Sequence, residues 1–470
     1  MIIFLSAVII YFILLIILGI YANKKSKKTA EDYFLANRTF GPLILFFTLA
    51  ATNFSAFTFL GFAGKAYTTG FGQYGIMGFG TAIMAIMFYI IGRKVWILGK
   101  EKGYITPPEL IGDRFNSKTL RLLFMSVMVI FTIPYLATQA IGAGMLIQSV
   151  TNASIGWQIG AIITMLVITI YVLFGGMRGS GWTDFIQGII MIIAMTLAVV
   201  FIAINLGAIE TSETLINVKP ELFNRPGGGE YFLPQIWFSF MLLWIFADPM
   251  FPQIFSRFYT AKNQKSLKYS MILYPIIVSF LFLFPVLIGV WANAADITVE
   301  TNDMVLPTMV LSYAPYYVYI FVMVGALAAL MSTADSQLLS LSTMLSKDIP
   351  WKKNKLSDIN IGRILIIILS LFAIIYVIIG FDPNEGIMGT LVKTTFSGLA
   401  VLCPTTIAAL YWEKATKHGC IMSIISGEIA IFSCHYLNIP YSISAIVGIS
   451  TSIIFLTIVS YLTKAKKLSG

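Results

Sequence analysis

The sequence predicts an all-α integral membrane protein that crosses the bilayer about thirteen times. Hydrophobic residues make up 58% of the 470 residues and charged residues only 11%. The mean hydropathy of +0.86 lies far above that of soluble globular proteins. Apolar runs long enough to cross the hydrocarbon core, which takes roughly 20 helical residues, recur along the whole chain. The connections between them are short, so we expect one polytopic membrane domain over residues 1–470.

The membrane spans follow from these apolar runs and the polar segments between them. We place them at residues 2–22, 41–68, 72–92, 122–149, 156–174, 183–207, 233–256, 269–292, 316–345, 360–380, 387–412, 419–437 and 442–463. The first run leads into a cluster of lysines and lacks a small-residue cleavage site. A retained signal-anchor helix is therefore expected there rather than a cleaved signal peptide.

The distribution of basic residues predicts the orientation. With the amino terminus outside, the cytoplasmic segments are 23–40, 93–121, 175–179, 257–268, 347–363, 413–418 and 464–470. Four of the 31 Lys and Arg residues lie elsewhere: Lys65, Lys219, Arg225 and Lys393. Because positive charge gathers on the cytoplasmic side, we expect a plasma membrane protein with its carboxyl terminus in the cytoplasm. The net charge of +10 then needs no nucleic-acid partner.

The second and seventh spans are expected to be broken helices. The second contains "LAATNFSAFTFLGFAG", with polar and small residues at mid-membrane depth, and the seventh contains "WIFADPMFPQIF", with Pro249 and Pro252. A proline removes a backbone donor and frees carbonyl oxygens. The two spans run in opposite directions and lie five spans apart. This spacing predicts an inverted repeat whose broken helices meet near the midplane. The expected units are 1–40, 41–231, 232–412 and 413–470.

The ninth span carries a polar stripe. Five hydroxyl side chains fall within roughly 100° of arc on one helix face: Ser332, Thr333, Ser336, Ser340 and Thr343. Small hydroxyl residues also serve for packing between membrane helices, which leaves a structural role open. Asp335 is harder to explain in this way, because a charged side chain at the bilayer centre costs about 2.5 to 3.5 kcal/mol. It implies a cation, a proton or a water-filled cavity.

Resident metal and cofactor sites are not expected. The three cysteines, Cys403, Cys420 and Cys434, have no metal-ligand spacing, and the two histidines lie at loop edges. The glycine-rich segment "NRPGGGEYF" lacks the strand and helix context of a nucleotide-binding turn. No paired nucleophile and base recur at one depth, so an enzyme is not expected. Glu428, Cys434 and His435 are interpreted as structural.

Four motifs carry a family resemblance. They are "EDYFLANRTFGP", "GGMRGSGWTDFIQG", "SRFYTAKN" and "AALMSTADSQLL". With them the chain resembles the sodium:solute symporter family, which includes sodium-coupled carriers of proline, pantothenate, monocarboxylates, glucose and sialic acid. The resemblance implies a LeuT-type fold with a 5+5 inverted repeat and thirteen helices. It implies sodium and a small solute as the transported partners, no cofactor, and a monomer or loose oligomer.

The resemblance also implies a sodium site between the break in the second span and the ninth span. The family pattern Ala-x-x-Ser-Ser/Thr is met by Ala329, Ser332 and Thr333, with the Ala329 carbonyl and the two hydroxyls as ligands. The facing carbonyls would come from Ala51 and Phe54. Both segments are sources of oxygen atoms that the membrane leaves unsatisfied, and such oxygens suit an alkali cation.

A second cation site or an ion exit path is implied at Asp184, Asp335 and Ser336. Asp184 matches the family aspartate on the exit path, although it could instead cap a helix at its amino-terminal end. Some relatives have hydroxyls at the positions of Asp335 and Ser336, and this chain departs from them with an aspartate. Asp335 could strengthen a sodium site with Asp184 or take up a proton.

The substrate pocket is implied between the two broken spans, the third span and the eleventh. The residues are Phe57, Thr58, Met77, Trp244, Asp248, Phe251, Gln253, Lys393 and Thr394. Met77 stands about where sugar carriers place a glutamate, which disfavours a sugar. Lys393 could pair with a carboxylate or extend to the interface. Asp248 could bind an amine or pair with a lysine.

We therefore expect sodium-coupled symport of a small carboxylate-bearing solute such as an amino acid, a monocarboxylate or pantothenate. Uptake of a sugar or of sialic acid is the alternative within this class. A cation channel would need polar rings on several helices, and only the ninth span has a polar stripe. A transporter-like sensor would need a cytoplasmic signalling domain, and the chain ends with "TKAKKLSG".

Overall fold

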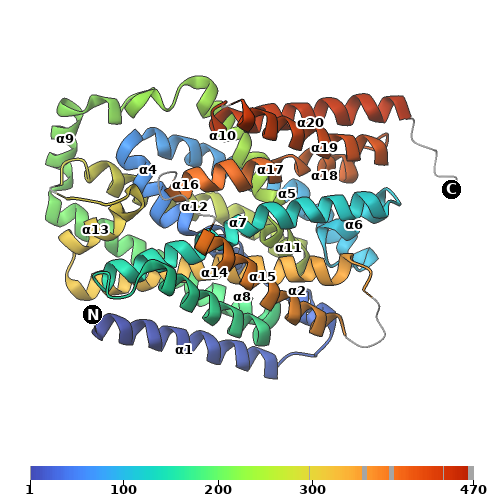
Figure 1. The fold of residues 1–470 in the computed structure, drawn as a ribbon, viewed down its shortest axis with the longest axis horizontal. Helices are drawn as coiled ribbons and strands as arrows, with labels where there is room; N and C mark the ends of the chain where they lie inside the picture. Colours follow the sequence, from blue (N-terminus) through green and yellow to red (C-terminus); the bar gives the residue numbers. More distant parts are fainter. Residues whose placement is uncertain (1, 296, 352–356, 380–385, 438, 464–470) are drawn as a thin grey trace.

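The molecule is a bundle of long helices aligned with one axis (Figure 1). The computed structural model describes residues 2–295, 297–351, 357–379, 386–437 and 439–463, except for the side chains of residues 78, 79, 81, 82, 394, 441 and 442. Helix α1 (Ile2–Lys24) begins at one end of the bundle, and α20 (Tyr441–Thr463) ends at the other. We call the end at which α1 begins the outer end and the opposite end the inner end.

The other helices follow in chain order. They are α2 (Ala30–Leu35), η1 (Ala36–Arg38), α3 (Pro42–Asn53), η2 (Phe57–Gly61), α4 (Phe62–Thr69), α5 (Gly72–Lys102), α6 (Pro107–Arg114), α7 (Lys118–Val150), α8 (Trp157–Leu206), α9 (Ala208–Val218), η3 (Pro220–Leu222), η4 (Gly228–Glu230), α10 (Pro234–Ala247), η5 (Asp248–Met250), α11 (Pro252–Thr260), α12 (Gln264–Trp291), η6 (Asn302–Met304), α13 (Val305–Tyr313), α14 (Tyr316–Asp348), α15 (Asp358–Ile379), α16 (Gly386–Leu391), η7 (Val392–Phe396), α17 (Ser397–Ala400), α18 (Leu402–Tyr411) and α19 (Lys417–Tyr436).

Two spans are broken where the sequence predicts it. The chain bends by 62° between α3 and η2 and by 53° between η5 and α11. In the first, Phe54 is extended with φ −77° and ψ 111°. In the second, Phe251 is extended between Pro249 and Pro252. Each proline leaves a carbonyl without its helical donor, which is why the helix ends there.

Helix α8 is a pair of spans joined without a loop. The sequence predicts spans at 156–174 and 183–207 with a connection between them, but helical turns continue on both sides of a single kink at Gly176. Gly176 has φ +52°, a conformation that favours glycine. A Cβ atom there would lie only 2.7 Å from the Tyr33 carbonyl oxygen. Glycine is therefore required for both the turn and the close approach of α2.

The two ends of α8 lie at the same end of the bundle. Trp157, its first residue, lines a pocket together with Thr308 of α13. Near its last residue, Asn205 donates a hydrogen bond to the carbonyl oxygen of Tyr313, also in α13. The chain therefore reverses at Gly176 and crosses the bundle twice within α8.

The observed crossings match the thirteen that the sequence predicts. In the described part of the chain, eight helices are long and apolar enough to span a membrane, or ten if each bent pair is one span. Because α8 crosses twice, the number becomes eleven. Helix α5 and the chain from α16 to α18 each run the length of the bundle and complete the set. The molecule is a multi-pass membrane protein.

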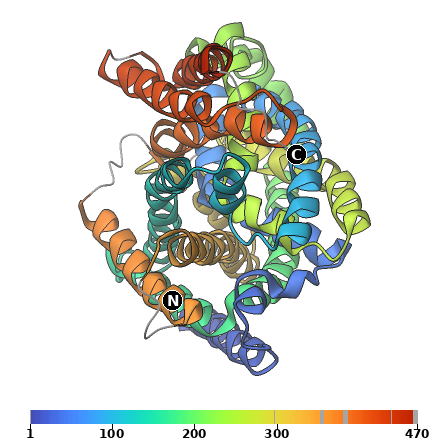
Figure 2. The ribbon, with the colours of Figure 1, turned by 90° about the vertical axis from the view of Figure 1, so that its right-hand side faces the viewer.

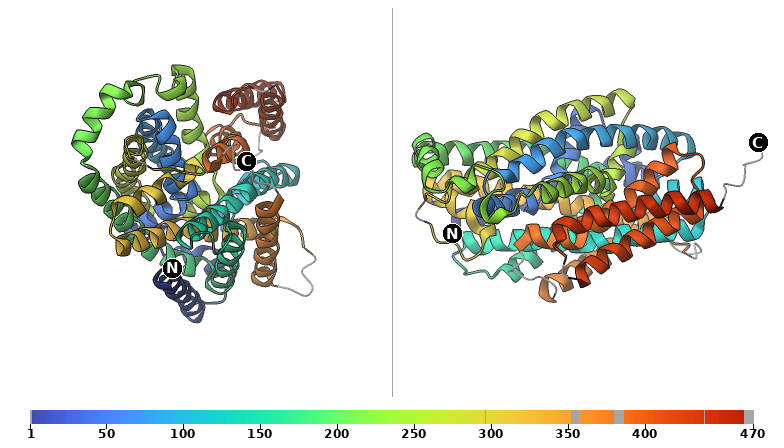
Figure 3. Two further views of the ribbon diagram at one scale, coloured as in Figure 1. Left: turned by 60° about the vertical axis from the view of Figure 1, so that its left-hand side comes forward. Right: turned by 90° about the horizontal axis from the view of Figure 1, so that it is seen from above.

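Helix α14 forms the centre of the bundle (Figure 2), and every residue over 325–344 is buried. Helix α1 lies at one edge. Helices α19 and α20 pack side by side at the opposite edge (Figure 3). The polar stripe of α14 is therefore enclosed by protein, and both broken spans contact the helix that carries it.

Candidate ion and substrate site

Five oxygen atoms meet where the break after α3 faces the middle of α14. Oγ of Ser332 donates to the carbonyl oxygen of Ala51 at 2.8 Å. Oγ1 of Thr333 donates to the carbonyl oxygen of Phe54 at 2.9 Å. Both hydroxyls also lie within hydrogen-bonding distance of the Ala329 carbonyl oxygen, at 2.9 and 3.2 Å. All five residues are buried. The residues that the resemblance implied as sodium ligands are thus brought together.

Side chains from α7 form hydrogen bonds with the residues of the break after α3. The backbone N–H of Ala56 donates to Oε1 of Gln139 at 2.9 Å, and the hydroxyl of Tyr135 donates to Oγ of Ser55 at 3.3 Å. These contacts satisfy polar groups that the interrupted helix leaves without partners. The carbonyl oxygens of the break therefore stay directed at α14.

A second polar cluster lies one turn further along α14, towards the inner end. Oδ1 of Asp335 accepts hydrogen bonds from Ser180 at 3.0 Å and Ser336 at 2.9 Å. Its Oδ2 accepts one from Thr183 at 3.3 Å. Asp184 lies within reach of the same group, because Ser180 is also 3.5 Å from its Oδ2. The three residues that the sequence singled out here, Asp184, Asp335 and Ser336, thus belong to one cluster.

Arg257 joins this cluster, and the sequence interpretation missed it. Its guanidinium is fully buried. Nη2 donates to Asp184 at 3.0 Å, Ser180 at 3.0 Å and Ser336 at 2.5 Å, and Nε donates to Thr48 at 3.0 Å. Thr48 in turn donates to Asp184. With both carboxyl groups ionised, Asp184, Asp335 and Arg257 together would carry one net negative charge.

The aromatic residues around Arg257 in the sequence could have identified it as a buried residue of a helix. The sequence interpretation placed it at the start of a cytoplasmic segment, 257–268, because the charge itself suggests an aqueous surface. Phe255, Phe258 and Tyr259 surround it with bulky apolar side chains, and α11 continues to Thr260. A basic residue enclosed in an aromatic helical turn is better explained by a buried acidic partner.

Five aromatic rings pack against one another beside the breaks. Trp244 contacts Phe57 and Phe396, with 5.4 Å between ring centroids in each pair. Phe396 also contacts Phe251 at 5.0 Å and Tyr135 at 5.2 Å. The predicted pocket residues Phe57, Trp244 and Phe251 are therefore neighbours. Tyr135 and Phe396 were not anticipated.

Asp248 links the two broken spans. Its Oδ2 accepts a hydrogen bond from Nδ2 of Asn53 at 2.9 Å, and the same nitrogen is 2.5 Å from the hydroxyl of Tyr274. The Asp248 side chain is buried. Asn53 lies between Ala51 and Phe54, so the side chain of Asp248 is connected to the segment that supplies two of the five oxygen atoms.

The remaining predicted pocket residues are more scattered. Met77 and Gln253 are buried, and Lys393 is half-buried in η7. Thr58 lines a small cavity with Phe54, Phe59, Met191, Met195 and Leu281, on the side of η2 that faces α8 and α12. None of the five rings of the aromatic cluster lines this cavity. The side chain of Thr394 lies outside the described residues.

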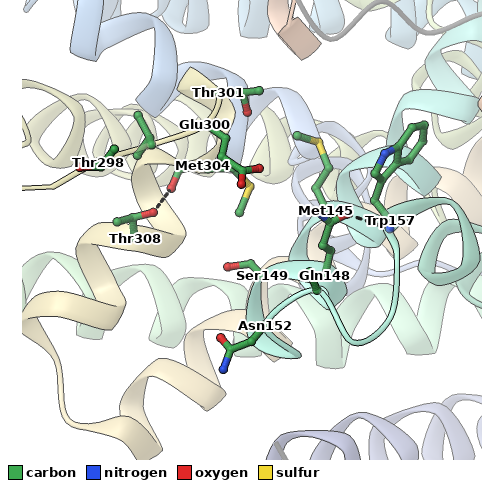
Figure 4. Close-up of a pocket in the computed structure, with 12 residues that line it drawn as sticks. Met145, Gln148, Ser149, Asn152, Trp157, Thr298, Glu300, Thr301, Met304 and Thr308 are labelled. Atoms are coloured by element: carbon green, nitrogen blue, oxygen red, sulfur yellow. Dashed lines mark hydrogen bonds between the residues drawn. The ribbon is translucent and has the colours of Figure 1, made fainter.

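A larger pocket, of about 450 Å³, opens at the outer end (Figure 4). Gln148, Ser149 and Asn152 from the end of α7 face Glu300 and Met304 from the connection between α12 and α13. None of the predicted sodium or substrate residues lines it.

Comparison with known proteins identifies similar chains over almost the whole length. The family model described as "Sodium:solute symporter family" matches residues 33–427. Sodium/proline symporters from several strains of Staphylococcus aureus, among them JH9 and COL, are 26% identical over 481 aligned positions. The alignment covers 97% of this chain and 92% of those proteins.

Two solved structures share the fold. One is a sodium-coupled sialic acid symporter in a substrate-bound, outward-open state, with a TM-score of 0.83, 18% identity and 99% coverage of both chains. The other is Mhp1, a nucleobase-cation-symport-1 family transporter in a closed conformation with bromovinylhydantoin bound. Its TM-score is 0.65 at 11% identity, with coverage of 92% of this chain and 94% of that chain. The bundle thus has the LeuT-type fold that the resemblance implied.

Proposed function

Because the chain belongs to the sodium:solute symporter family, we propose that it couples sodium entry to uptake of a small carboxylate-bearing solute. Amino acids, monocarboxylates and pantothenate are the candidate classes. The names of the Staphylococcus aureus relatives, sodium/proline symporters, support a solute of this size. The methionine at position 77, where sugar carriers of the family have a glutamate, argues against a sugar.

The observation that carries the proposal is the meeting of five oxygen atoms across a helix break. We assign the sodium ion to the carbonyl oxygens of Ala51, Phe54 and Ala329 and the hydroxyls of Ser332 and Thr333. Neutral, hard oxygen atoms can replace part of the hydration shell of an alkali cation. The ligands come from α3 and α14, so a bound ion would hold the two elements together.

Coupling follows from which elements the ion joins. A sodium ion between α3 and α14 favours the conformation in which the five oxygen atoms converge. A solute bound beside the same break favours that conformation as well. Each ligand then raises the affinity of the other by the same factor, as linkage requires. Alternating access results when the broken helices, with the bound ion and solute, move relative to the rest of the bundle.

The cluster of Asp184, Asp335 and Ser336 is proposed as a second cation site on the inner side of the first. Its residual negative charge in the presence of Arg257 supports this role. So does Oδ1 of Asp184, which is buried and has no hydrogen-bond partner among the described residues. An ion that leaves the first site towards the inner end would meet these oxygen atoms next.

Uptake by purified protein in proteoliposomes tests the sodium assignment. We expect the double variant Ser332→Ala/Thr333→Ala to lose sodium-driven uptake, because two of the five ligands are removed. Ser342→Ala is the matched control. Ser342 is buried on the same helix, but among the described residues its hydroxyl bonds to the Leu339 carbonyl oxygen one turn back, at 2.9 Å, and to no other group. Undiminished sodium dependence in the double variant would overturn the assignment.

A further inference from the structure

We infer that the transported solute carries a positively charged amine that pairs with Asp248. This inference rests on the proposed function and narrows its substrate class. Amino acids, imino acids and betaines have such a group together with a carboxylate, whereas monocarboxylates and pantothenate lack it. The inference follows from the partners of Asp248, from the rings beside it and from unpartnered donors nearby.

Asp248 is a buried carboxylate without a cationic partner in the described part of the chain. Three other buried aspartates are paired with an arginine: Asp184 with Arg257 at 3.0 Å, Asp348 with Arg121 at 2.7 Å and Asp32 with Arg178 at 2.6 Å. Asp335 and Asp303 form no ion pair among the described residues either, but Asp335 shares Ser180 and Ser336 with Arg257, and Asp303 lies at the outer end. The carboxylate of Asp248 accepts one hydrogen bond from a described residue, the neutral amide of Asn53. A charged carboxylate at this depth is expensive, so a cation from outside the protein would stabilise it.

The surroundings suit an organic cation better than a metal ion. Trp244 lies one helical turn before Asp248, on the same face of α10, and the backbone N–H of Asp248 donates to the Trp244 carbonyl oxygen. The aromatic cluster of Phe57, Trp244, Phe396, Phe251 and Tyr135 therefore includes a ring one helical turn before Asp248 and another, Phe251, three residues after it. Aromatic faces attract ammonium groups, whereas a sodium ion needs several oxygen ligands.

Polar groups that could bind the other end of a zwitterion lie before and after the second break. Nε1 of Trp244 and both amide atoms of Gln253 are buried and have no hydrogen-bond partner among the described residues. Buried polar groups are normally satisfied, so these atoms are available to a ligand or to water. N–H groups of this kind would bind the carboxylate of the solute while Asp248 binds its amine.

The Asp248 carboxylate is also connected to the proposed sodium site. Asn53, which donates to Asp248, is flanked by Ala51 and Phe54, whose carbonyl oxygens belong to the proposed sodium site. An amine that settles on Asp248 would therefore fix the backbone that presents those oxygens. Substrate charge and ion binding would be coupled through one side chain.

Matched pairs of solutes test the inference in proteoliposomes with a sodium gradient. Glycine betaine and 3,3-dimethylbutyrate have the same shape and carboxylate but differ in the positive charge. L-Proline and tetrahydrofuran-2-carboxylate differ in the same way. We expect sodium-dependent uptake of the charged member of at least one pair and exclusion of its neutral partner. Uptake of a neutral member at the rate of its charged partner, or of neutral members alone, would overturn the inference.

The variant Asp248→Asn keeps the shape and the acceptor for Asn53 but removes the charge. We expect the KM for the charged solute to rise roughly 30-fold or more, as for the loss of one partner of a buried charge pair. Discrimination within the pair should also disappear, which a purely structural role would not cause. Glu428→Gln, which changes a buried carboxyl group on the peripheral helix α19, is the matched control and should leave the KM unchanged.

Measuring how far sodium stabilises each variant against heat distinguishes a failure of the amine assignment from a failure of the proposed sodium-coupled uptake. Asp248→Asn should still be stabilised by sodium, because none of the five oxygen ligands is altered. An unchanged KM in this variant, with sodium stabilisation retained, would overturn the amine assignment alone. If no solute in either pair is taken up with sodium and the wild-type protein gains no stability from sodium, the proposed function fails, and the inference fails with it.

Discussion

At the scale of single residues, the guanidinium of Arg257 organises the inner half of the site. It donates to Asp184, Ser180, Ser336 and Thr48, four residues from three helices. A buried charge of this kind contributes little net stability while it is paired, but removal of one partner leaves the other desolvated and uncompensated. Arg257 and Asp184 should therefore depend on one another.

Replacement of Arg257 with glutamine is expected to destabilise the protein by about 3 to 5 kcal/mol, because Asp184 would lose its ion pair. Combining it with Asp184→Asn should recover part of this loss, since position 184 would then carry no unpaired buried charge. Thermal unfolding of the detergent-purified single and double variants measures both effects. Equal stability of Arg257→Gln and the wild type would show that the ion pair between Arg257 and Asp184 does not stabilise the folded protein.

The sequence identified the proposed ligands on α14 more readily than the other residues that surround them. The hydroxyls of Ser332 and Thr333 were predictable because polar residues stand out in an apolar helix and match a family motif. Arg257 was missed because its acidic partner lies 73 positions away in the sequence, although the aromatic residues around it were a signal of burial. Tyr135 and Phe396 were missed for a related reason: aromatic residues are common in membrane helices, and only tertiary contacts distinguish the five that pack together beside the breaks.

At the scale of helices, the breaks were predictable and some connections were not. Prolines at 249 and 252 mark the bend after η5, and the polar run around Asn53 marks the bend after α3. The helical turns between Gly176 and the predicted span at 183–207 were not anticipated, since a basic residue and several glycines indicated a loop. Helices α9 and α13 were also missed, because both are too short to register as membrane spans.

One contact between elements at the outer end predicts a pH dependence. Oδ2 of Asp303 in η6 accepts a hydrogen bond from the backbone N–H of Ile387 at 2.9 Å, which joins the connection before α13 to the start of α16. Asp303 is buried, and burial raises the pKa of its carboxyl group to about 6, although the Ile387 N–H acts in the opposite direction. In the unfolded chain the pKa would be near 4.

Because the folded-state pKa is the higher one, the contribution of Asp303 to stability is fully present below about pH 4. It is lost as the pH rises through about 6, and the total change is roughly 3 kcal/mol. We expect the wild-type protein to lose stability relative to Asp303→Asn over this range. Unfolding temperatures measured from pH 4 to 7.5 provide the comparison. Parallel profiles for the two proteins would contradict the prediction.

At the scale of the whole molecule, the fold places the ion site where its occupancy can control a conformational change. Helix α14 is central, and both bent spans contact it. The order of the helices was accessible from hydropathy, and the positions of the breaks from the polar run around Asn53 and the prolines at 249 and 252. The convergence of the oxygen atoms was not, since it depends on how the repeats pack together, and the family motif supplied that information.

The central claim is that one sodium ion binds between the break after α3 and the hydroxyls of α14. Equilibrium binding of ²²Na⁺ to the purified wild-type protein and to Ser332→Ala/Thr333→Ala tests it most directly. We expect saturable binding to the wild type, with at least one site lost in the double variant and none lost in Ser342→Ala. The same number of sites with the same affinity in the wild type and the double variant would contradict it.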